Sequence, residues 1–319
     1  MKSKVSLSKL LLRSVPPLSG MSGLAAVLSF SIFTAALDVY AGHVLQQIEV
    51  SILVFICFTT TAAIFFTKET LQKNNVFRFI AKHPQDVWAL NITTAISWLG
   101  LFYALKYLEP AIVSVISIAI GPIFTIVLGY FLRRQAKVFL MELVCAACIF
   151  LVMLGLAWLS LSGNSAIGNA TSASILQGLL AALLSGLASA ANIVFSKRLS
   201  DRKVSVSSIM SIRFFLIIGI AFALSYAHWQ EFSWEIYTIV SAIVISVVGT
   251  VLPLYLLHIG IEKIEPITVS FIVTTAPILT FFLQGFDRRL STSWHSLMGI
   301  LLILILVYVT SVLRFKRSK

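Results

Sequence analysis

Arg213 is the residue in this sequence with the strongest need for a partner, because its charged side chain lies inside an apolar segment at about 205–227. It lies about eight residues into that segment, which is roughly 12 Å along an α-helix at about 1.5 Å per residue. An arginine near the centre of a membrane helix costs about 2.5–3.5 kcal/mol, so it is usually paired or faces water. We predict that Glu142, Asn192 or a bound anion holds the guanidinium; snorkelling to the membrane interface is the alternative.

Two prolines could expose hydrogen-bonding groups to a bound molecule. Pro122 and Pro277 each fall in the middle of an apolar segment. Proline removes one helix hydrogen bond and frees a carbonyl one turn earlier, and a kinked helix beside a cavity can offer that carbonyl to a ligand. A tolerated structural kink is the alternative. Because proline recurs at both places, we interpret the pair as functional helix kinks.

Several polar and aromatic side chains lie inside apolar segments, away from the interface that tryptophan and tyrosine usually occupy. Trp98 is too central for an interfacial belt, so it either lines an apolar cavity or packs against a neighbouring helix. A row of small residues precedes Asn192, and such rows let helix backbones approach closely. The row consists of Gly178, Ala182, Gly186 and Ala190. The predicted cavity-lining residues are Trp98, Tyr103, Ser114, Asn192, Arg213, Tyr255, Ser270 and Thr274.

Patterns typical of enzymes and metal sites are absent from the sequence. There is no Gly-x-x-x-x-Gly-Lys-Ser/Thr loop, no His-Glu-x-x-His pair and no serine nucleophile elbow. Cys145 and Cys148 have the spacing of half a zinc site, but there is no second pair, so we interpret them as buried packing residues. Asp38, Glu49 and Glu142 are expected near segment ends, so no carboxylate proton relay is predicted. We predict no catalytic residue, no metal and no cofactor.

The elements that must position these residues are membrane-spanning helices. The 319 residues are 59% hydrophobic and 11% charged, whereas a soluble protein has roughly 25% charged residues. A span needs about 20 mostly apolar residues, and its backbone must bond internally, so each long apolar run is predicted to be a helix. The predicted helices are ten, at about 18–38, 48–67, 86–107, 110–132, 138–160, 174–196, 205–227, 235–258, 265–286 and 293–314.

The basic residues are distributed unevenly between the ends of these runs. The net charge is +12, but Lys and Arg are scattered singly, which argues against nucleic-acid binding. If both termini lie in the cytoplasm, 20 of the 24 basic residues are inside, Arg213 is within a span, and the three outside are Lys106, Arg288 and Arg289. Positively charged inner loops are typical of membrane proteins. We therefore predict a multi-pass protein of the bacterial inner membrane with both termini cytoplasmic.

The two halves of the chain share landmarks at matching places. A long uncharged loop at 161–174 separates a first repeat, 1–162, from a second, 172–319. Because five spans is an odd number, the second repeat must insert upside down, and inverted repeats are characteristic of secondary transporters. Structural duplication without transport is the alternative. The shared landmarks are Glu109-Pro110 and Glu265-Pro266, Pro122 and Pro277, Arg133-Arg134 and Arg288-Arg289, and Ser114 and Ser270.

These landmarks resemble a known family. Two five-helix halves, whose fourth helices open with Ala104-Leu105-Lys106-Tyr107-Leu108-Glu109-Pro110 and Gly260-Ile261-Glu262-Lys263-Ile264-Glu265-Pro266, resemble the drug/metabolite transporter superfamily and its EamA-like exporters. Arg213-Phe214 is similar to an Arg-Phe pair of the second and seventh helices in that group. Val54-Phe55 stands where the first pair would fall, and the Gly-Glu that often ends the fourth and ninth helices is absent. The resemblance implies movement of amino acids, other metabolites or drugs across the inner membrane.

We therefore expect an all-α integral membrane protein of ten helices that moves a small organic solute by alternating access, as an exporter and not as an enzyme. Its expected partners are the solute and membrane lipid, with a coupling ion or counter-substrate left open, and its working unit is a monomer or a homodimer. A sugar or nucleotide-sugar carrier of the same superfamily is the main alternative. An intramembrane lipid-modifying enzyme would need a nucleophile or metal cluster, and a channel would need polar rings.

The charge distribution makes the topology testable. A single cysteine at Ser165, in the predicted external loop, should react with a membrane-impermeant maleimide on intact cells, because 20 basic residues hold the opposite loops inside. A cysteine at Ser3 is the matched control and should react only after permeabilisation. Protection of the Ser165 position in intact cells would contradict the predicted orientation.

Overall fold

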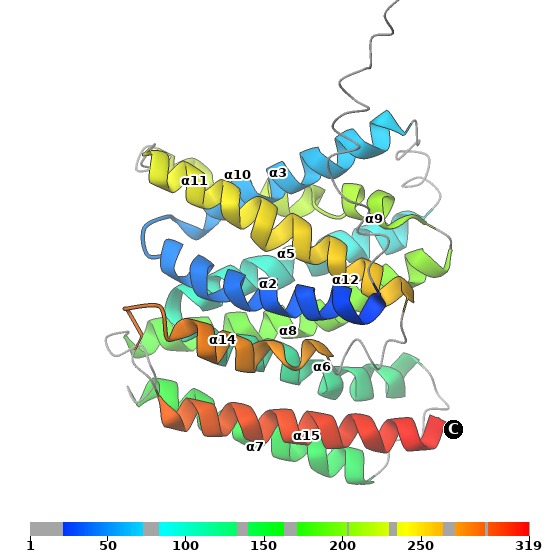
Figure 1. Ribbon diagram of the computed structural model, residues 1–319, viewed down its shortest axis with the longest axis vertical. Coiled ribbons are helices and arrows are strands. Elements are labelled where there is room, and N and C mark those ends of the chain that lie inside the picture. Colours follow the sequence, from blue (N-terminus) through cyan, green and yellow to red (C-terminus); the bar gives the residue numbers. More distant parts are fainter. Residues whose placement is uncertain are drawn as a thin grey trace, which may run out of the picture.

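The computed structural model describes residues 22–72, 83–132, 140–162, 171–202, 204–229, 235–263, 272–290 and 293–318, and every regular element in these ranges is helical (Figure 1). The first half contains α2 (Gly23–Val44), α3 (Val50–Leu71), α5 (Pro84–Tyr107), α6 (Pro110–Leu132) and α7 (Leu140–Leu161). The second half contains α8 (Ser172–Asp201), α9 (Val206–Ile212), α10 (Phe215–Ser225), a short 3₁₀ turn (Tyr226–His228), α11 (Ile236–Val244), the π-helix η3 (Ile245–Val251), α12 (Leu252–Lys263), α14 (Ala276–Gln284) and α15 (Trp294–Ser318). The prediction of an all-α protein is confirmed.

Several of these helices are long and apolar enough to cross a membrane. Six such segments are Gly23–Val44, Val50–Leu71, Pro84–Tyr107, Ser172–Asn192, Val206–Ser225 and Ile236–Gly260. Shorter apolar helices cover Pro110–Ile120, Ala147–Leu161 and Trp294–Val309. Large hydrophobic side chains such as Trp158 and Ile236 point outward and are 73% and 80% exposed, as expected of surfaces that face lipid. The chain is therefore a multi-pass membrane protein.

The helices lie side by side and pack in specific pairs (Figure 1). α5 packs along α8, α12 packs along α2, and α6 also lies against α8. α3 contacts α10, α6 contacts α14, and α7 pairs with α15. Figure 1 shows that α7 and α15 form one margin of the bundle, while α2, α5 and α8 lie nearer the middle of the row of helices.

Small residues permit the closest of these approaches. A Cβ atom on Gly186 of α8 would lie 2.2 Å from Ile120 Cγ2 and 2.8 Å from the Ser117 carbonyl of α6. Gly260 of α12 lies equally close to Val27 of α2. The small-residue row in α8 therefore lies at helix contacts, as predicted from the sequence.

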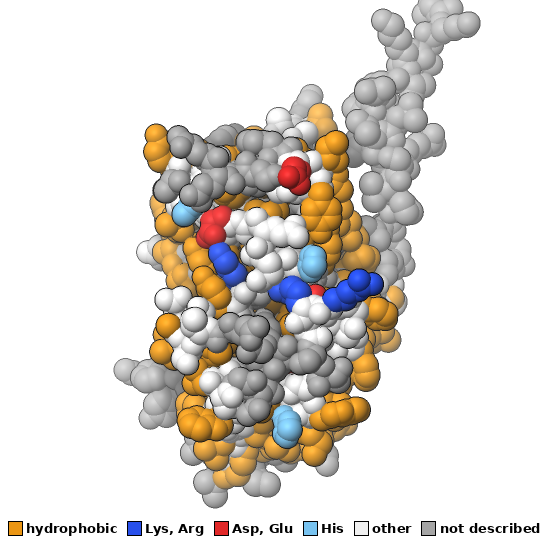
Figure 2. Space-filling view, turned by 90° about the vertical axis from the view of Figure 1, so that its left-hand side faces the viewer, with side chains coloured by type: hydrophobic (Ala, Val, Ile, Leu, Met, Phe, Trp, Pro, Cys, Tyr) orange, Lys and Arg blue, Asp and Glu red, His pale blue; other side chains and the backbone are white. Residues whose placement is uncertain are grey.

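Charged side chains gather at one end of the bundle, where the turn after α2 meets the turn after α14. Lys106 Nζ lies 2.8 Å from a carboxylate oxygen of Glu49, and Arg289 donates to Asp287 at 2.7 Å. Burial alone would raise the pKa of Asp287, but hydrogen bonds from Arg289, its charge and that of His43 hold the pKa below its ordinary value. Figure 2 looks onto this end and shows polar and charged side chains surrounded by hydrophobic ones.

The Glu-Pro phrase of the first half has a structural role at this same end. Glu109 is buried, at 1% exposed, directly before α6. Its carboxylate accepts hydrogen bonds from Gln284 Nε2 at 2.7 Å and from Ser296 Oγ at 2.9 Å. Gln284 Oε1 in turn accepts from the Ala111 N–H at 3.2 Å. This buried carboxylate therefore ties the start of α6 to α14 and α15. The counterpart Glu265 lies outside the described residues.

Three of the predicted helices are interrupted. The segment predicted at 205–227 consists of α9 and α10, separated at Arg213 and Phe214. The segment predicted at 235–258 widens into a π-helix that ends just before Pro253, which has no N–H to donate to the carbonyl one turn earlier. Within the described part of the ninth segment, α14 begins only at Ala276. The sequence predicted a helix in each of these segments but not these local breaks; Val206–Ser225 and Ile236–Gly260 are still each long and apolar enough to cross a membrane.

The tight contact at Gly186 can be tested by substitution. Gly186→Ala should lower the free energy of unfolding by about 1–3 kcal/mol, because the new methyl group overlaps Ile120 and the Ser117 carbonyl. Gly219→Ala in α10 is the matched control, since no atom lies within 4 Å of its Cβ position. That control should be neutral or should stabilise by up to about 1 kcal/mol through helix propensity. Equal melting temperatures for the two variants in detergent would contradict this packing.

Candidate functional site

The candidate site is built around the break between α9 and α10. Asn91 of α5 holds the break open, because its Nδ2 donates to the Ile212 carbonyl at 2.8 Å and its Oδ1 accepts from the Leu216 N–H at 3.2 Å. One amide side chain thus forms hydrogen bonds with one backbone group before the break and one after it. The break places Arg213 in the interior of the bundle, where only 3% of its surface is exposed.

Neutral groups surround the guanidinium of Arg213. Its Nη2 donates to Asn192 Oδ1 at 2.6 Å, while Nε lies 3.4 Å from Thr94 Oγ1 and Nη1 lies 3.7 Å from Met210 Sδ. Asn192 Nδ2 donates to Thr94 Oγ1 at 2.7 Å, so these polar groups form one connected network. Of the partners predicted from the sequence, Asn192 is confirmed, whereas the side chain of Glu142 lies outside the described residues.

A second buried polar group belongs to the same region. His258 of α12 is 7% exposed, and its Nδ1 is hydrogen-bonded to the Leu254 carbonyl at 2.8 Å. Because a carbonyl only accepts, Nδ1 carries the proton in this contact and Nε2 offers a lone pair if the ring is neutral. In the described part of the chain no partner reaches Nε2. α12 packs against α9, the helix that ends beside Arg213.

Aromatic side chains form one wall of this region. The ring of Phe214 lies 5.3 Å from that of Phe58, and Phe58 lies 5.2 Å from Trp98 in an edge-to-face arrangement. Trp98 also contacts Phe102, with ring centroids 6.0 Å apart. Trp98 is therefore half-buried against a cluster that begins at the residue next to Arg213. We refer to Phe58, Trp98, Phe102 and Phe214 as the aromatic cluster.

The other residues predicted to line a cavity lie elsewhere. Ser114 is buried on α6 and hydrogen-bonded to Asp38, whose side chain is also buried although it was expected near a helix end. Tyr255 of α12 lies under the ammonium of Lys68, 5.0 Å from the ring centre. Thr274 is half-buried in the turn before α14, and Ser270 lies outside the described residues. The structure thus brings together only Arg213 and Asn192, with Trp98 beside them.

The two predicted proline kinks have different settings. α6 is helical on both sides of Pro122, whose side chain is outside the described residues. Pro277 lies in the first turn of α14, where a missing N–H leaves no helix bond broken. Just before that turn, the Ile272 carbonyl accepts from Thr275 Oγ1 at 2.7 Å and from Ser31 Oγ at 3.3 Å. The Ile272 carbonyl therefore already accepts hydrogen bonds from two side chains of the protein.

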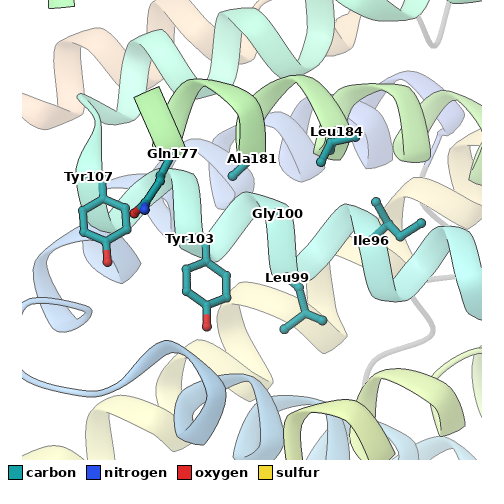
Figure 3. A pocket seen from close by; sticks show the side chains of 8 residues that line it. All are labelled: Ile96, Leu99, Gly100, Tyr103, Tyr107, Gln177, Ala181 and Leu184. Carbon is teal, nitrogen blue, oxygen red and sulfur yellow. The ribbon is translucent and has the colours of Figure 1, made fainter. Parts of the chain in front are cut away.

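A surface groove of about 420 Å³ lies between α5 and α8, apart from the Arg213 network (Figure 3). None of its lining residues is charged. They are Ile96, Leu99, Gly100, Tyr103, Tyr107, Gln177, Ala181 and Leu184. Tyr103 thus belongs to this groove and not to the buried network. We place the candidate site at Arg213 because a buried cation makes a stronger demand for a ligand than an apolar groove.

Sequence reasoning missed Asn91 and Thr94, which complete the network from α5. The missed signal was their spacing, because residues at i, i+3 and i+7 lie on one face of a helix and Trp98 occupies the third position. A polar and aromatic face in an otherwise apolar span indicates contact with something polar inside the bundle.

This arrangement is that of a multi-pass helical membrane protein with a buried polar site between two sets of helices. Residues 176–312 match the model of the EamA-like transporter family. The matched segment lies in the second half of the chain, and the match supports membership of the drug/metabolite transporter superfamily.

Comparison with solved structures bears on the fold. The crystal structure of another protein superposes with a TM-score of 0.61 at 16% identity, covering 92% of this chain and 97% of that one. At this identity the likeness shows the fold alone. No curated protein matches the sequence.

The contact between Arg213 and Asn192 can be tested by a double-mutant cycle. Arg213→Met and Asn192→Leu should each destabilise by about 1–3 kcal/mol, because each leaves a buried partner unsatisfied. The double variant should lose clearly less than the sum of the two. Gln177→Leu is the control, because Gln177 lies on the same helix as Asn192 but 15 residues, or about 22 Å, away from it. Its effect on the free energy of unfolding should add to that of Arg213→Met. Additive losses in both cycles would show that Arg213 and Asn192 do not interact.

Proposed function

We propose that the protein is a secondary transporter that moves a small organic solute across the bacterial inner membrane by alternating access, as an exporter with both termini cytoplasmic. The observation that carries this proposal is Arg213, a buried cation held by neutral groups at a helix break in the bundle interior. Discontinuous helices with polar groups between two halves of a bundle are typical of transporter binding sites.

The pattern of helix contacts supports an inverted repeat of five spans in each half. We take α2 to correspond to α8, α3 to α9 and α10, α5 to α11 through α12, α6 to α14, and α7 to α15. Exchange of the halves then maps several of the main helix contacts onto one another. The contact of α5 with α8 maps onto that of α12 with α2, and α6 with α8 maps onto α14 with α2. α3, α6 and α7 each contact their own counterparts. This is the behaviour expected of a two-fold axis through the bundle.

The register of the second and seventh helices supports the same axis. α3 begins at Val50 and α9 begins at Val206, so Cys57 and Arg213 are each the seventh residue after that start. By this register Phe58 corresponds to Phe214, and the two rings lie 5.3 Å apart. A residue that contacts its own counterpart lies close to the symmetry axis. Cys57-Phe58, rather than Val54-Phe55, therefore takes the place of the Arg-Phe pair in the first half.

Alternating access requires contacts at both ends of the bundle to open in turn. At one end stand the ion pairs of Lys106 with Glu49 and of Arg289 with Asp287. At the other, Arg198 lies 3.3 Å from Asp86, and Ser208 of α9 donates to Glu69 of α3. The pair of Lys106 with Glu49 suits reversible closure best, because both side chains are partly exposed, at 23% and 30%, and exposed ion pairs contribute only about 0–1 kcal/mol.

Counterflow in proteoliposomes tests this proposal directly. Vesicles loaded with an excess of one unlabelled solute should accumulate the same labelled solute transiently, because a carrier exchanges faster than it equilibrates. The panel should contain carboxylates, amines, sugars and neutral amides. A channel would give equilibration without accumulation. Absence of counterflow for every class would contradict the transporter proposal.

The aromatic cluster provides a second test. Trp98→Ala should weaken solute affinity by about 2- to 10-fold, because an aromatic contact contributes about 0.5–1.5 kcal/mol. Trp158→Ala is the matched control, since Trp158 is 73% exposed on the outer surface. KM from counterflow and folded yield should be measured for both. Wild-type KM in a Trp98→Ala protein that is merely less stable would make Trp98 a packing residue.

A further inference from the structure

We propose that Arg213 binds the carboxylate of the transported solute, so that the solute is a small organic acid with a compact apolar or aromatic body. This inference rests on the proposed function and names the substrate class of the same site. It begins with the hydrogen-bonding capacity of the guanidinium, which has five N–H donors: one on Nε and two on each terminal nitrogen.

The protein uses only part of that capacity. Among the residues that the structure describes, the acceptors are Thr94 at Nε, Met210 at Nη1 and Asn192 at Nη2. Only the Asn192 contact, at 2.6 Å, is short; the others are 3.4 and 3.7 Å. One N–H therefore remains on each of the two terminal nitrogens. A pair of adjacent N–H groups on a planar fork matches the two oxygens of a carboxylate.

Among the described residues, the charge of Arg213 is also left without a counterion. Each buried acid in the described ranges has other partners: Asp38 bonds to Ser114, Glu69 to Ser208, Asp86 to Arg198 and Arg202, Glu109 to Gln284 and Ser296, and Asp287 to Arg289. None of them forms an ion pair with Arg213. A cation buried among neutral groups is costly, and an anion that enters the site repays part of that cost.

The surroundings narrow the class of anion. Cys57 occupies the position that corresponds to Arg213 in the other half, so the site offers one cation and suits one carboxylate rather than two. Phe58 and Phe214 follow these two positions in the chain and their rings lie 5.3 Å apart, and Trp98 extends this aromatic wall, which suits an apolar or aromatic body. His258 Nε2, on the helix that packs against α9, is a second buried polar atom for which the described residues supply no partner.

Matched acids and amides test the inference without knowledge of the natural solute. The probes are benzoate and benzamide, phenylacetate and phenylacetamide, and isovalerate and isovaleramide, titrated into the purified full-length protein and read by thermal shift. The wild type should bind at least one acid about 10- to 100-fold more tightly than its amide, as expected for charge-assisted hydrogen bonds. Arg213→Gln should lose that preference, and Arg213→Lys should keep part of it, because lysine retains charge but not the planar fork.

Arg288→Gln is the matched control, because it removes the same charge from an exposed turn and should leave the acid preference unchanged. If Arg213→Gln does not fold, the partial loss in Arg213→Lys decides. No acid preference in the wild type, or full preference in the Arg213 variants, overturns the inference.

Counterflow separates the carboxylate-site proposal from the transporter proposal. Counterflow without acid preference leaves the transporter standing and removes the carboxylate site, whereas Arg213-dependent acid binding without counterflow does the reverse.

Discussion

The burial of one guanidinium charge, held by neutral groups and by no carboxylate among the described residues, is the constraint on which the interior of this protein depends. Arg213 reaches the interior because the seventh span is broken beside it, and the break persists because Asn91 bonds to backbone groups on both sides. Asn192 and Thr94 then hold the guanidinium through neutral oxygens. A carboxylate in their place would satisfy the charge permanently. Neutral partners orient the fork and leave its charge available to a ligand.

The second feature is the combination of a symmetric frame with asymmetric chemistry. In the proposed inverted repeat, helix pairs recur across the two halves, and the ring of Phe58 contacts that of Phe214, its proposed counterpart. One residue earlier in each half, the symmetry fails, because Cys57 is a small apolar side chain and Arg213 is a cation. A symmetric frame allows equivalent inward and outward states, whereas a single cation fixes which way a bound solute is oriented in both.

The sequence determined the class of protein because hydropathy is additive along the chain. Apolar runs such as those around Val50 and Pro84 are long enough to span a bilayer, and lipid forces their backbones into helices whatever their neighbours are. The repeated Glu-Pro phrases pointed to the family for a similar reason, since they are local signals. Arg213 also stood out without any structure, because a lone arginine in an apolar run demands an explanation.

Only the tertiary structure decided which groups form hydrogen bonds with the buried guanidinium of Arg213. Thr94 and Asn192 are 98 residues apart and yet share a hydrogen bond, and no local pattern predicts which two faces will meet. The helix breaks were equally hidden, since the bond that replaces the broken backbone contact at Ile212 comes from Asn91, 121 positions earlier. The hydropathy of each segment determines that it lies in the membrane. Which polar groups face one another is set by helix packing, at the points where small residues such as Gly186 let the backbones approach.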